Sequence, residues 1–187
     1  MSNNILGYYK NDGTICSSPF ECDYAQLELL GQNAVSHNAV TLISKVHLEL
    51  ILQFVWYLGK DGYPVTHGTD DKSIVYGRCL KMHKLLISDI PKGYVIDHIN
   101  RNKLDNRITN LRVCTAKENS YNTTKRAQSL NKYKGIKQQK NNLWSATITK
   151  NGKNYKIDDI QTDKEAAIIY DAMAEELFGE FAGKNFE

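Results

Sequence analysis

An aspartate and a histidine stand side by side, Asp97 and His98, where the mostly apolar run 94–99 meets a loop rich in Asn, Arg and Lys. Hydrolysis of a phosphodiester needs a base that activates water and a cation that offsets the charge on the phosphate. His98 can act as the base, because the ordinary pKa of histidine is close to neutral. Asp97 can offer a hard oxygen ligand to a cation. The pair is therefore either half of a metal site or the solvated end of a strand.

A second metal ligand must come from elsewhere in the chain, and Asn119 is a candidate. It lies 21 residues after His98. The helix expected there begins at Thr115, because Thr115 and Glu118 have the spacing of a capping box, in which each side chain satisfies a backbone N–H at the helix start. Asn119 then falls in the first turn, where its amide oxygen is a neutral, hard donor.

The strands predicted over 94–99 and 111–115 would bring these residues together if they pair and the helix packs across them. Adjacent residues on a regular strand face opposite sides. Asp97 and His98 can therefore serve one phosphate only where the strand relaxes into the loop, with His98 reaching the water and Asp97 the metal.

The preceding residues give weaker signals. Residues 1–40 show no clear period and form a segment of unclear role. Within 39–58, apolar residues recur at every fourth position and predict a short helix (Val46, Leu50 and Phe54). A strand is expected over 62–67, and a strand running into a helix over 73–87. His83 lies on that helix and is given no catalytic role, since a lone helical histidine is more often a packing residue.

The last part of the chain predicts a small α+β module. Strands are expected over 133–139, 143–150 and 153–160, and the pair Asn151-Gly152 favours a tight hairpin turn. Thr162 and Glu165 form another capping box. The helix that follows has one apolar stripe and ends near Gly179 (Ala166, Ile169, Met173 and Leu177).

Charge and composition restrict the class of protein. The net charge is only +3, but basic residues concentrate between 117 and 140, which suggests a polyanion partner; the alternative is a solvated, lysine-rich linker. No apolar run approaches the length of a membrane span, and no secretory signal is visible, so we expect a cytoplasmic protein of a bacterial or phage-infected cell. The four cysteines lack C-x-x-C spacing and are expected to be reduced.

The stretch KMHKLLI, followed by GYVIDHINRNKLDNRITNLRVCTAKENSYN, resembles HNH endonucleases of the phage homing type, which have a ββα-metal (His-Me finger) fold. The resemblance covers about 41–124. It implies that His98 is the general base and that Asp97 and Asn119 bind one divalent cation, Mg²⁺ or Mn²⁺. It further implies that Asn110 fixes the loop that orients His98. The cysteine pairs that hold a structural zinc in some HNH proteins are missing.

The stretches YKGI, TDKEAAIIYDAMA and FGEFAGKNF resemble an Apetala/ethylene-response-factor-type DNA-binding domain, over about 130–187. In that family a three-stranded sheet enters the major groove and a helix packs behind it. The resemblance implies reading positions at Lys134, Lys137, Gln139, Thr147, Thr149, Asn154 and Lys156. We expect further DNA contacts from Arg107, Lys125 and Arg126.

Several positions depart from that family's pattern. The arginines that read G-rich sites are replaced by Lys, Gln, Thr or Asn, so G-rich readout is not expected. Asp158 and Ile160 replace the usual Gly and Phe after the third strand. Trp144 is assigned to core packing, because Trp144, Ala146 and Ile148 alternate with the polar Ser145, Thr147 and Thr149.

The sequence therefore predicts an α+β protein: a segment of unclear role (1–40), a nuclease domain (41–124), a linker (125–131) and a DNA-binding domain (132–187). The predicted function is a metal-dependent DNA endonuclease that makes nicks or double-strand breaks. It would act on double-stranded DNA, with a monomer as the default. The alternative is a DNA-binding regulator whose HNH part is inactive. A purely structural phage protein would leave the basic tract and the three site residues unexplained.

Overall fold

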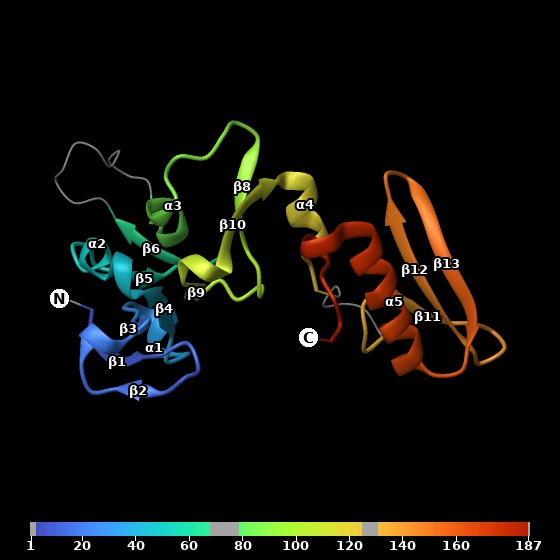
Figure 1. Ribbon diagram of the computed structural model, residues 1–187, viewed down its shortest axis with the longest axis horizontal. Coiled ribbons are helices and arrows are strands. Elements are labelled where there is room, and N and C mark those ends of the chain that lie inside the picture. The colour runs from blue at the N-terminus through green and yellow to red at the C-terminus, as the bar shows by residue number, and fades with distance from the viewer. Residues whose placement is uncertain (1–2, 68–78, 125–130, 187) are drawn as a thin grey trace. The chain divides into compact units, whose positions relative to one another are not determined.

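The computed structural model describes residues 3–67, 79–124 and 131–186. It divides the chain into two compact units, Met1–Cys114 and Thr115–Glu187 (Figure 1). The predicted linker at 125–131 lies almost entirely outside the described residues, as do Lys125 and Arg126. None of the helices in the described ranges is long and apolar enough to span a membrane.

The first unit is built on a five-stranded sheet to which the N-terminal segment contributes three strands. Its order is β2-β1-β3-β4-β9, and only the β4–β9 pair is parallel. The strands are β1 (Ile5–Tyr9), β2 (Ile15–Cys16), β3 (Tyr24–Glu28), β4 (Val40–Ser44) and β9 (Asp105–Asn106). Residues 1–40, whose role the sequence leaves unclear, thus share one fold with the candidate site.

Short helices and buried apolar side chains complete this unit. The helical turns before β4 are η1 (Pro19–Glu21) and α1 (Gln32–Val35). Leu27, Ile43, Ile51, Trp56 and Met82 are all buried in one core cluster. Because Met82 begins a helix far along the chain from the sheet residues, this core fastens the helix to the N-terminal strands.

The helix predicted within 39–58 is shorter than expected. It is confined to the turn η2 (Lys45–His47) and to α2 (Leu48–Ile51). Val46 lies in the turn η2 as the short helix requires, but 78% of it is exposed, so it does not belong to a buried apolar face. The residues before it form β4 instead, because strands on both sides supply backbone hydrogen-bond partners.

A three-stranded sheet, β5-β6-β7, follows in the chain. Its strands are β5 (Tyr57–Leu58), β6 (Pro64–His67) and β7 (Cys79–Lys81), and β7 runs directly into α3 (Met82–Leu86). The predicted strand at 62–67 and the strand-to-helix passage before residue 87 are confirmed where the structure describes them. Residues 68–78 lie outside that description.

The two strands expected around the Asp97–His98 pair are present. β8 (Tyr94–His98) pairs with β10 (Leu111–Thr115), and the turn η3 (Ile108–Asn110) leads into β10. Helix α4 (Ala116–Tyr121) follows, and its capping box between Thr115 and Glu118 is confirmed. The chain thus has the order strand, strand, helix, and α4 is assigned to the second unit.

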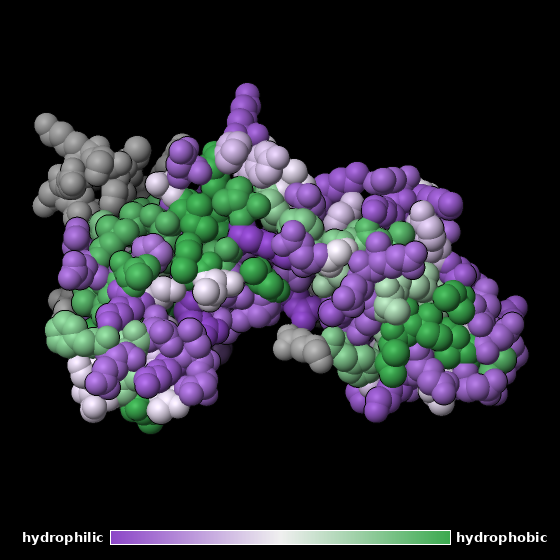
Figure 2. Space-filling model, in the orientation of Figure 1, coloured by the Kyte–Doolittle hydropathy of each residue, from purple (hydrophilic) through white to green (hydrophobic). Residues whose placement is uncertain are grey.

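The second unit contains the predicted three strands and helix. Its sheet has the order β11-β12-β13, from β11 (Ile136–Gln138), β12 (Trp144–Lys150) and β13 (Lys153–Ile160). Asn151 and Gly152 both have positive φ, 53° and 78°, as the hairpin prediction requires. In the view of Figure 2, hydrophilic residues cover most of this unit.

Helix α5 (Asp163–Phe178) covers one face of that sheet, and η4 (Gly179–Phe181) follows it. The capping box of Thr162 and Glu165 is confirmed, and Gly179 ends the helix with φ 56°. The core between sheet and helix includes Ala146, Ile148 and Ala166, with Trp144 partly buried against it. The predicted apolar alternation of β12 is therefore confirmed at these positions.

Candidate active site

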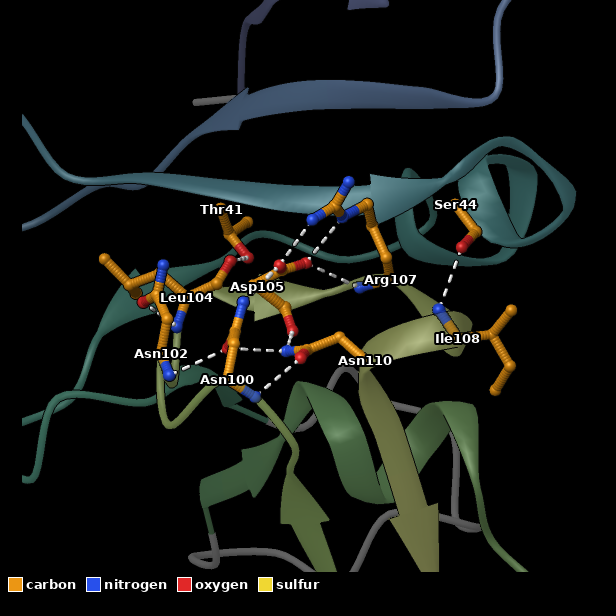
Figure 3. Close-up of polar contacts among 9 residues, drawn as sticks. All are labelled: Thr41, Ser44, Asn100, Asn102, Leu104, Asp105, Arg107, Ile108 and Asn110. Carbon is orange, nitrogen blue, oxygen red and sulfur yellow. Dashed lines mark hydrogen bonds and ion pairs between the residues drawn. The ribbon is translucent and has the colours of Figure 1, made fainter. Parts of the chain in front are cut away.

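The loop between β8 and β10 is held closed by Asn110. Its Nδ2 donates to Oδ1 of Asn100 at 2.9 Å and to the backbone oxygen of Asp105 at 2.8 Å. Its Oδ1 accepts from the backbone N–H of Asn100 at 2.9 Å (Figure 3). The side chain is 7% exposed, so these bonds form away from solvent. Asn110 therefore ties both ends of the loop together just after His98.

Asp105 adds an ionic contact to the same loop (Figure 3). Arg107 donates to both of its carboxylate oxygens, at 2.8 and 2.7 Å, and Asn100 donates to Oδ2 at 2.8 Å. Burial alone would raise the pKa of Asp105, but the hydrogen bonds and charge of Arg107 outweigh it and hold that pKa below its usual value. The guanidinium of Arg107, predicted as a DNA contact, is thus paired within the loop and lies over the ring of Tyr24.

Asn106 connects the loop to the sheet. The parallel pairing of β4 with β9 sets Ile43 opposite Asn106. The amide Nδ2 of Asn106 donates to Thr41 Oγ1 at 3.0 Å and to the backbone oxygen of Lys103 at 3.2 Å. A backbone oxygen can only accept, so these bonds fix which end of the amide is nitrogen.

The oxygen of that amide faces the candidate base. Oδ1 of Asn106 lies 3.2 Å from Nε2 of His98. Because an amide oxygen accepts, Nε2 must carry the proton, and the neutral ring then has its lone pair on Nδ1. Sequence reasoning missed Asn106, although the Asp-Asn-Arg run in the loop contains it.

His98 is held neutral by its surroundings. It is 5% exposed. Burial lowers its pKa below the ordinary 6.5, while the hydrogen bond to Asn106 and the charges of Asp97 and Asp105 act in the opposite direction. A buried imidazole that remains neutral at physiological pH can accept a proton, which is the requirement for a general base.

A second histidine lies against the first. The ring of His83, on α3, meets the ring of His98 edge to face, with centroids 5.3 Å apart, and also packs against Tyr63. His83 is 5% exposed, and burial is the largest cause that lowers its pKa to about 4. Within the described residues its Nδ1 has no hydrogen-bond partner. The sequence predicts no catalytic role for His83, and its only signal for this contact is the position of His83 on the apolar face of the predicted helix.

Asp97 forms an ion pair with Arg112, a residue that the sequence did not indicate. Arg112, on the paired strand β10, donates from Nη2 and Nε to Oδ2 of Asp97, at 2.7 and 3.0 Å. Their side chains are only 12% and 7% exposed. Asp97 is therefore held in a mostly buried ion pair next to His98. The available sequence signal for this contact was the position of Arg112 on the strand predicted to pair with that of Asp97.

The carboxylate of Asp97 and the carboxamide of Asn119, the two predicted ligands, are groups of the kind that suits a hard cation. A carboxylate and carboxamide oxygens are the ligands that Mg²⁺ and Mn²⁺ prefer. Among the described residues, no cluster of three His, Cys, Asp or Glu side chains forms a metal site, and the four cysteines form no disulfide. Asn119 lies on α4 in the second unit, whereas Asp97, His98, Asn106 and Asn110 belong to the first.

The predicted reading positions lie mostly on the sheet of the second unit. Lys137 pairs opposite Ser145, Thr147 opposite Lys156, and Thr149 opposite Asn154, with Ala146 and Ile148 of the same strand packed toward α5. Directly opposed residues share a face, so these positions line the face away from the helix.

Some of these side chains also contact one another. Lys156 forms an ion pair with Asp158 at 2.7 Å, Gln139 donates to the same carboxylate, and the hydroxyl of Thr149 donates to Asn154 at 2.6 Å. Lys134 is different, because its ammonium donates to backbone oxygens inside the unit.

Comparisons with known proteins identify relatives of this chain and a family match over the segment that contains Asp97 and His98. Residues 89–121 match the HNH endonuclease family. The chain is 38% identical over 141 residues to a protein of Acanthamoeba polyphaga mimivirus described as an uncharacterized HNH endonuclease, a match that spans 73% of this chain and 69% of the relative. The chain belongs to the HNH endonuclease family.

Two further relatives come from phages. The chain is 37% identical over 94 residues to protein 3.8 of Escherichia phage T7, across 50% of this chain and 77% of that protein. It is 48% identical over 42 residues to a protein of the SPbeta prophage of Bacillus subtilis (strain 168), whose name proposes an HNH homing endonuclease, across 22% of this chain and 24% of that protein. No solved structure matches significantly.

Proposed function

We propose that this chain is a metal-dependent DNA endonuclease of the homing type, in which His98 is the general base. The observation that carries the proposal is the bond between Nε2 of His98 and Oδ1 of Asn106. It fixes the tautomer whose lone pair is on Nδ1, while burial lowers the pKa of the ring and keeps it neutral. A base with one defined acceptor nitrogen is what activation of a water molecule requires.

The chemical step follows from that tautomer. Nδ1 of His98 takes a proton from water as the water oxygen bonds to phosphorus and the bond to the leaving sugar oxygen breaks. The imidazolium that forms is stabilised by the nearby charges of Asp97 and Asp105, which partly oppose the lowering of the pKa of His98 by burial. Asp105, itself paired with Arg107, is thus proposed to support the base through its charge.

We propose that a divalent cation assists the reaction. By the family resemblance, Asp97 and Asn119 would hold one divalent cation, Mg²⁺ or Mn²⁺. When bound, such a cation offsets the charge that builds on the phosphate and on the leaving oxygen. Support comes from the carboxylate of Asp97, which two hydrogen bonds from Arg112 hold in one orientation.

Asn110 is proposed as a positioning residue. Its three hydrogen bonds hold the loop at Asn100 and Asp105, and the backbone N–H of Ile99 donates to the oxygen of Asn110 at 2.9 Å. These contacts hold the segment that directly follows His98 and so restrict where its ring can point.

The proposed partner is double-stranded DNA, bound mainly by the open face of the second unit's sheet. That face carries exposed lysines and short polar side chains, which suit phosphate contacts and close approach to a groove. The proposed contacts are Lys137, Gln139, Thr147, Thr149, Asn154 and Lys156. Arg107, Lys125 and Arg126 are proposed as additional contacts.

A plasmid assay tests the proposal. Purified full-length protein is incubated with supercoiled plasmid carrying the DNA that flanks its own gene, with Mg²⁺, with Mn²⁺ or with a chelator. We expect nicked or linear product only with a divalent metal. His98→Ala should abolish cleavage and leave DNA affinity nearly unchanged, because the base acts in the chemical step.

His37→Ala is the matched control, since His37 is an exposed histidine of the same unit, outside the site. It should cleave like the wild type. Cleavage by His98→Ala at the wild-type rate would refute the assignment of the base. DNA binding by the wild type without cleavage in any divalent metal would indicate a DNA-binding regulator instead.

A further inference from the structure

The ammonium of Lys134 sits in a cage of backbone oxygens. Its Nζ donates to the oxygens of Tyr121 at 3.1 Å, Thr123 at 2.7 Å and Gly183 at 3.2 Å. An ammonium group has three N–H donors, and three oxygens receive them here. Tyr121 is the last residue of α4, so the lysine binds backbone oxygens that the end of a helix leaves without intrahelical partners.

Gly183 makes an independent contact with the same segment. Its N–H donates to the oxygen of Tyr121 at 3.2 Å. A Cβ added at Gly183 would lie 2.7 Å from the backbone oxygens of both Tyr121 and Thr123. No real side chain fits at that distance. The close packing of the C-terminal tail against the end of α4 therefore requires glycine at position 183.

An aromatic stack provides the third contact. The rings of Tyr121 and Phe178 lie with centroids 3.9 Å apart and an interplanar angle of 16°. Phe178 is the last residue of α5, the helix that packs on the sheet. One helix end is thus held by a lysine next to β11, by the end of α5 and by the C-terminal tail.

We propose that Lys134 is a positioning residue for Asn119 and not a DNA reader. By anchoring the end of α4, it makes the amide of Asn119 part of the same rigid body as the DNA-binding sheet. The role of Asn119 rests on the proposed function. It follows that the second unit supplies both the DNA-binding surface and one metal ligand, so loss of the anchor impairs use of the metal more than binding of DNA.

The experiment uses four full-length variants. Lys134→Met removes the ammonium and keeps the length of the side chain, and Gly183→Ala disturbs the same segment without changing charge. Lys137→Met removes a lysine from the proposed DNA-binding face. Lys164→Met is the control, because Lys164 is an exposed lysine on α5, outside the proposed DNA-binding face.

Three quantities are measured for each variant: hydrogen exchange of the amides of 116–123, DNA affinity in chelator, and the metal concentration for half-maximal nicking at saturating DNA. In Lys134→Met and Gly183→Ala we expect faster exchange in 116–123 and a metal requirement raised about tenfold, the effect expected for loss of charge-assisted hydrogen bonds. DNA affinity should stay close to the wild-type value. Lys137→Met should weaken DNA binding and leave exchange and metal requirement unchanged.

Two results would overturn the inference. One is unchanged exchange of 116–123 in Lys134→Met, which would show that the lysine does not hold α4. The other is a loss of DNA affinity equal to that of Lys137→Met with an unchanged metal requirement, which would make Lys134 a DNA contact. If the wild type cleaves no DNA with any metal, the proposed function fails, and the exchange data alone then decide whether Lys134 anchors the helix.

Discussion

His98 and Asn106 form the hydrogen bond that defines the candidate base. Oδ1 of Asn106 lies 3.2 Å from Nε2 of His98, and both side chains are buried. Asn106 is itself fixed by Thr41, 65 residues away in the chain. The tautomer of the imidazole therefore depends on the packing of the N-terminal sheet against the loop.

Asn106→Leu should slow nicking without weakening DNA binding. Leucine has a similar size but accepts no hydrogen bond, so either ring nitrogen of His98 could carry the proton. We expect nicking to fall roughly a hundredfold, within the range that general base catalysis contributes. Single-turnover nicking and DNA affinity are the measurements. Asn4→Leu, a change at an exposed asparagine of the same unit, should have neither effect, and an Asn106→Leu variant as fast as the wild type would contradict the role of the amide.

Asn119→Asp and Asn119→Ala should differ in metal use. Aspartate keeps an oxygen donor and adds charge, so activity should persist with an altered metal preference, whereas alanine offers no donor and should lose most activity. Asn119→His should also be tolerated if the resemblance to other HNH enzymes extends to this position. Nicking is titrated with Mg²⁺ and Mn²⁺, and Ser120→Ala serves as the neighbouring control. Equal activity of the Asp and Ala variants would show that Asn119 is not a ligand.

His83 should make the first unit lose stability in mild acid. Its pKa is about 4 in the folded protein and near 6.5 when the chain is unfolded. Between these values the unfolded state binds more protons, so stability falls as pH drops from 6.5 towards 4. The full effect is about 3 kcal/mol, by the free energy of a pKa shift of that size.

His83→Phe tests that effect, because phenylalanine keeps a ring against Tyr63 and cannot be protonated. Denaturant unfolding at pH 7 and pH 5 should show a smaller loss of stability in the variant than in the wild type. Since Nδ1 of His83 has no hydrogen-bond partner within the described residues, the substitution should break no hydrogen bond of that atom. An identical pH dependence in both proteins would exclude His83 as its source.

Substitutions at Asp97 and Arg112 should separate the contribution of their ion pair to stability from the contribution of Asp97 to cleavage. Arg112→Met leaves a buried carboxylate without its ion pair and should lower the free energy of unfolding by about 3 kcal/mol. The double variant Asp97→Leu with Arg112→Met removes both charges and should recover most of that stability while remaining unable to cleave. Unfolding by denaturant and plasmid nicking are measured together. Cleavage by the stable double variant would show that Asp97 serves the fold only.

The sequence by itself determined the local features. The capping boxes at Thr115 and Thr162, the Asn151-Gly152 turn and α5 all follow from interactions between residues a few positions apart, and the structure has each of them. The strand ending in Asp97 and His98 was equally visible, because an apolar run followed by a polar loop is a local pattern. The roles of Asp97, His98, Asn110 and Asn119 remain predictions.

The tertiary structure alone decided what surrounds those residues. The N-terminal strands, the parallel β4–β9 pair, the contact of His83 with His98 and the ion pair of Asp97 with Arg112 join segments that no short period relates. Lys134 shows the same limit, since nothing in YKGI indicates that its ammonium meets backbone oxygens of α4 and of the C-terminal tail. Such contacts depend on how segments distant in the sequence pack against one another in the folded chain. Residue type and local spacing do not specify that packing.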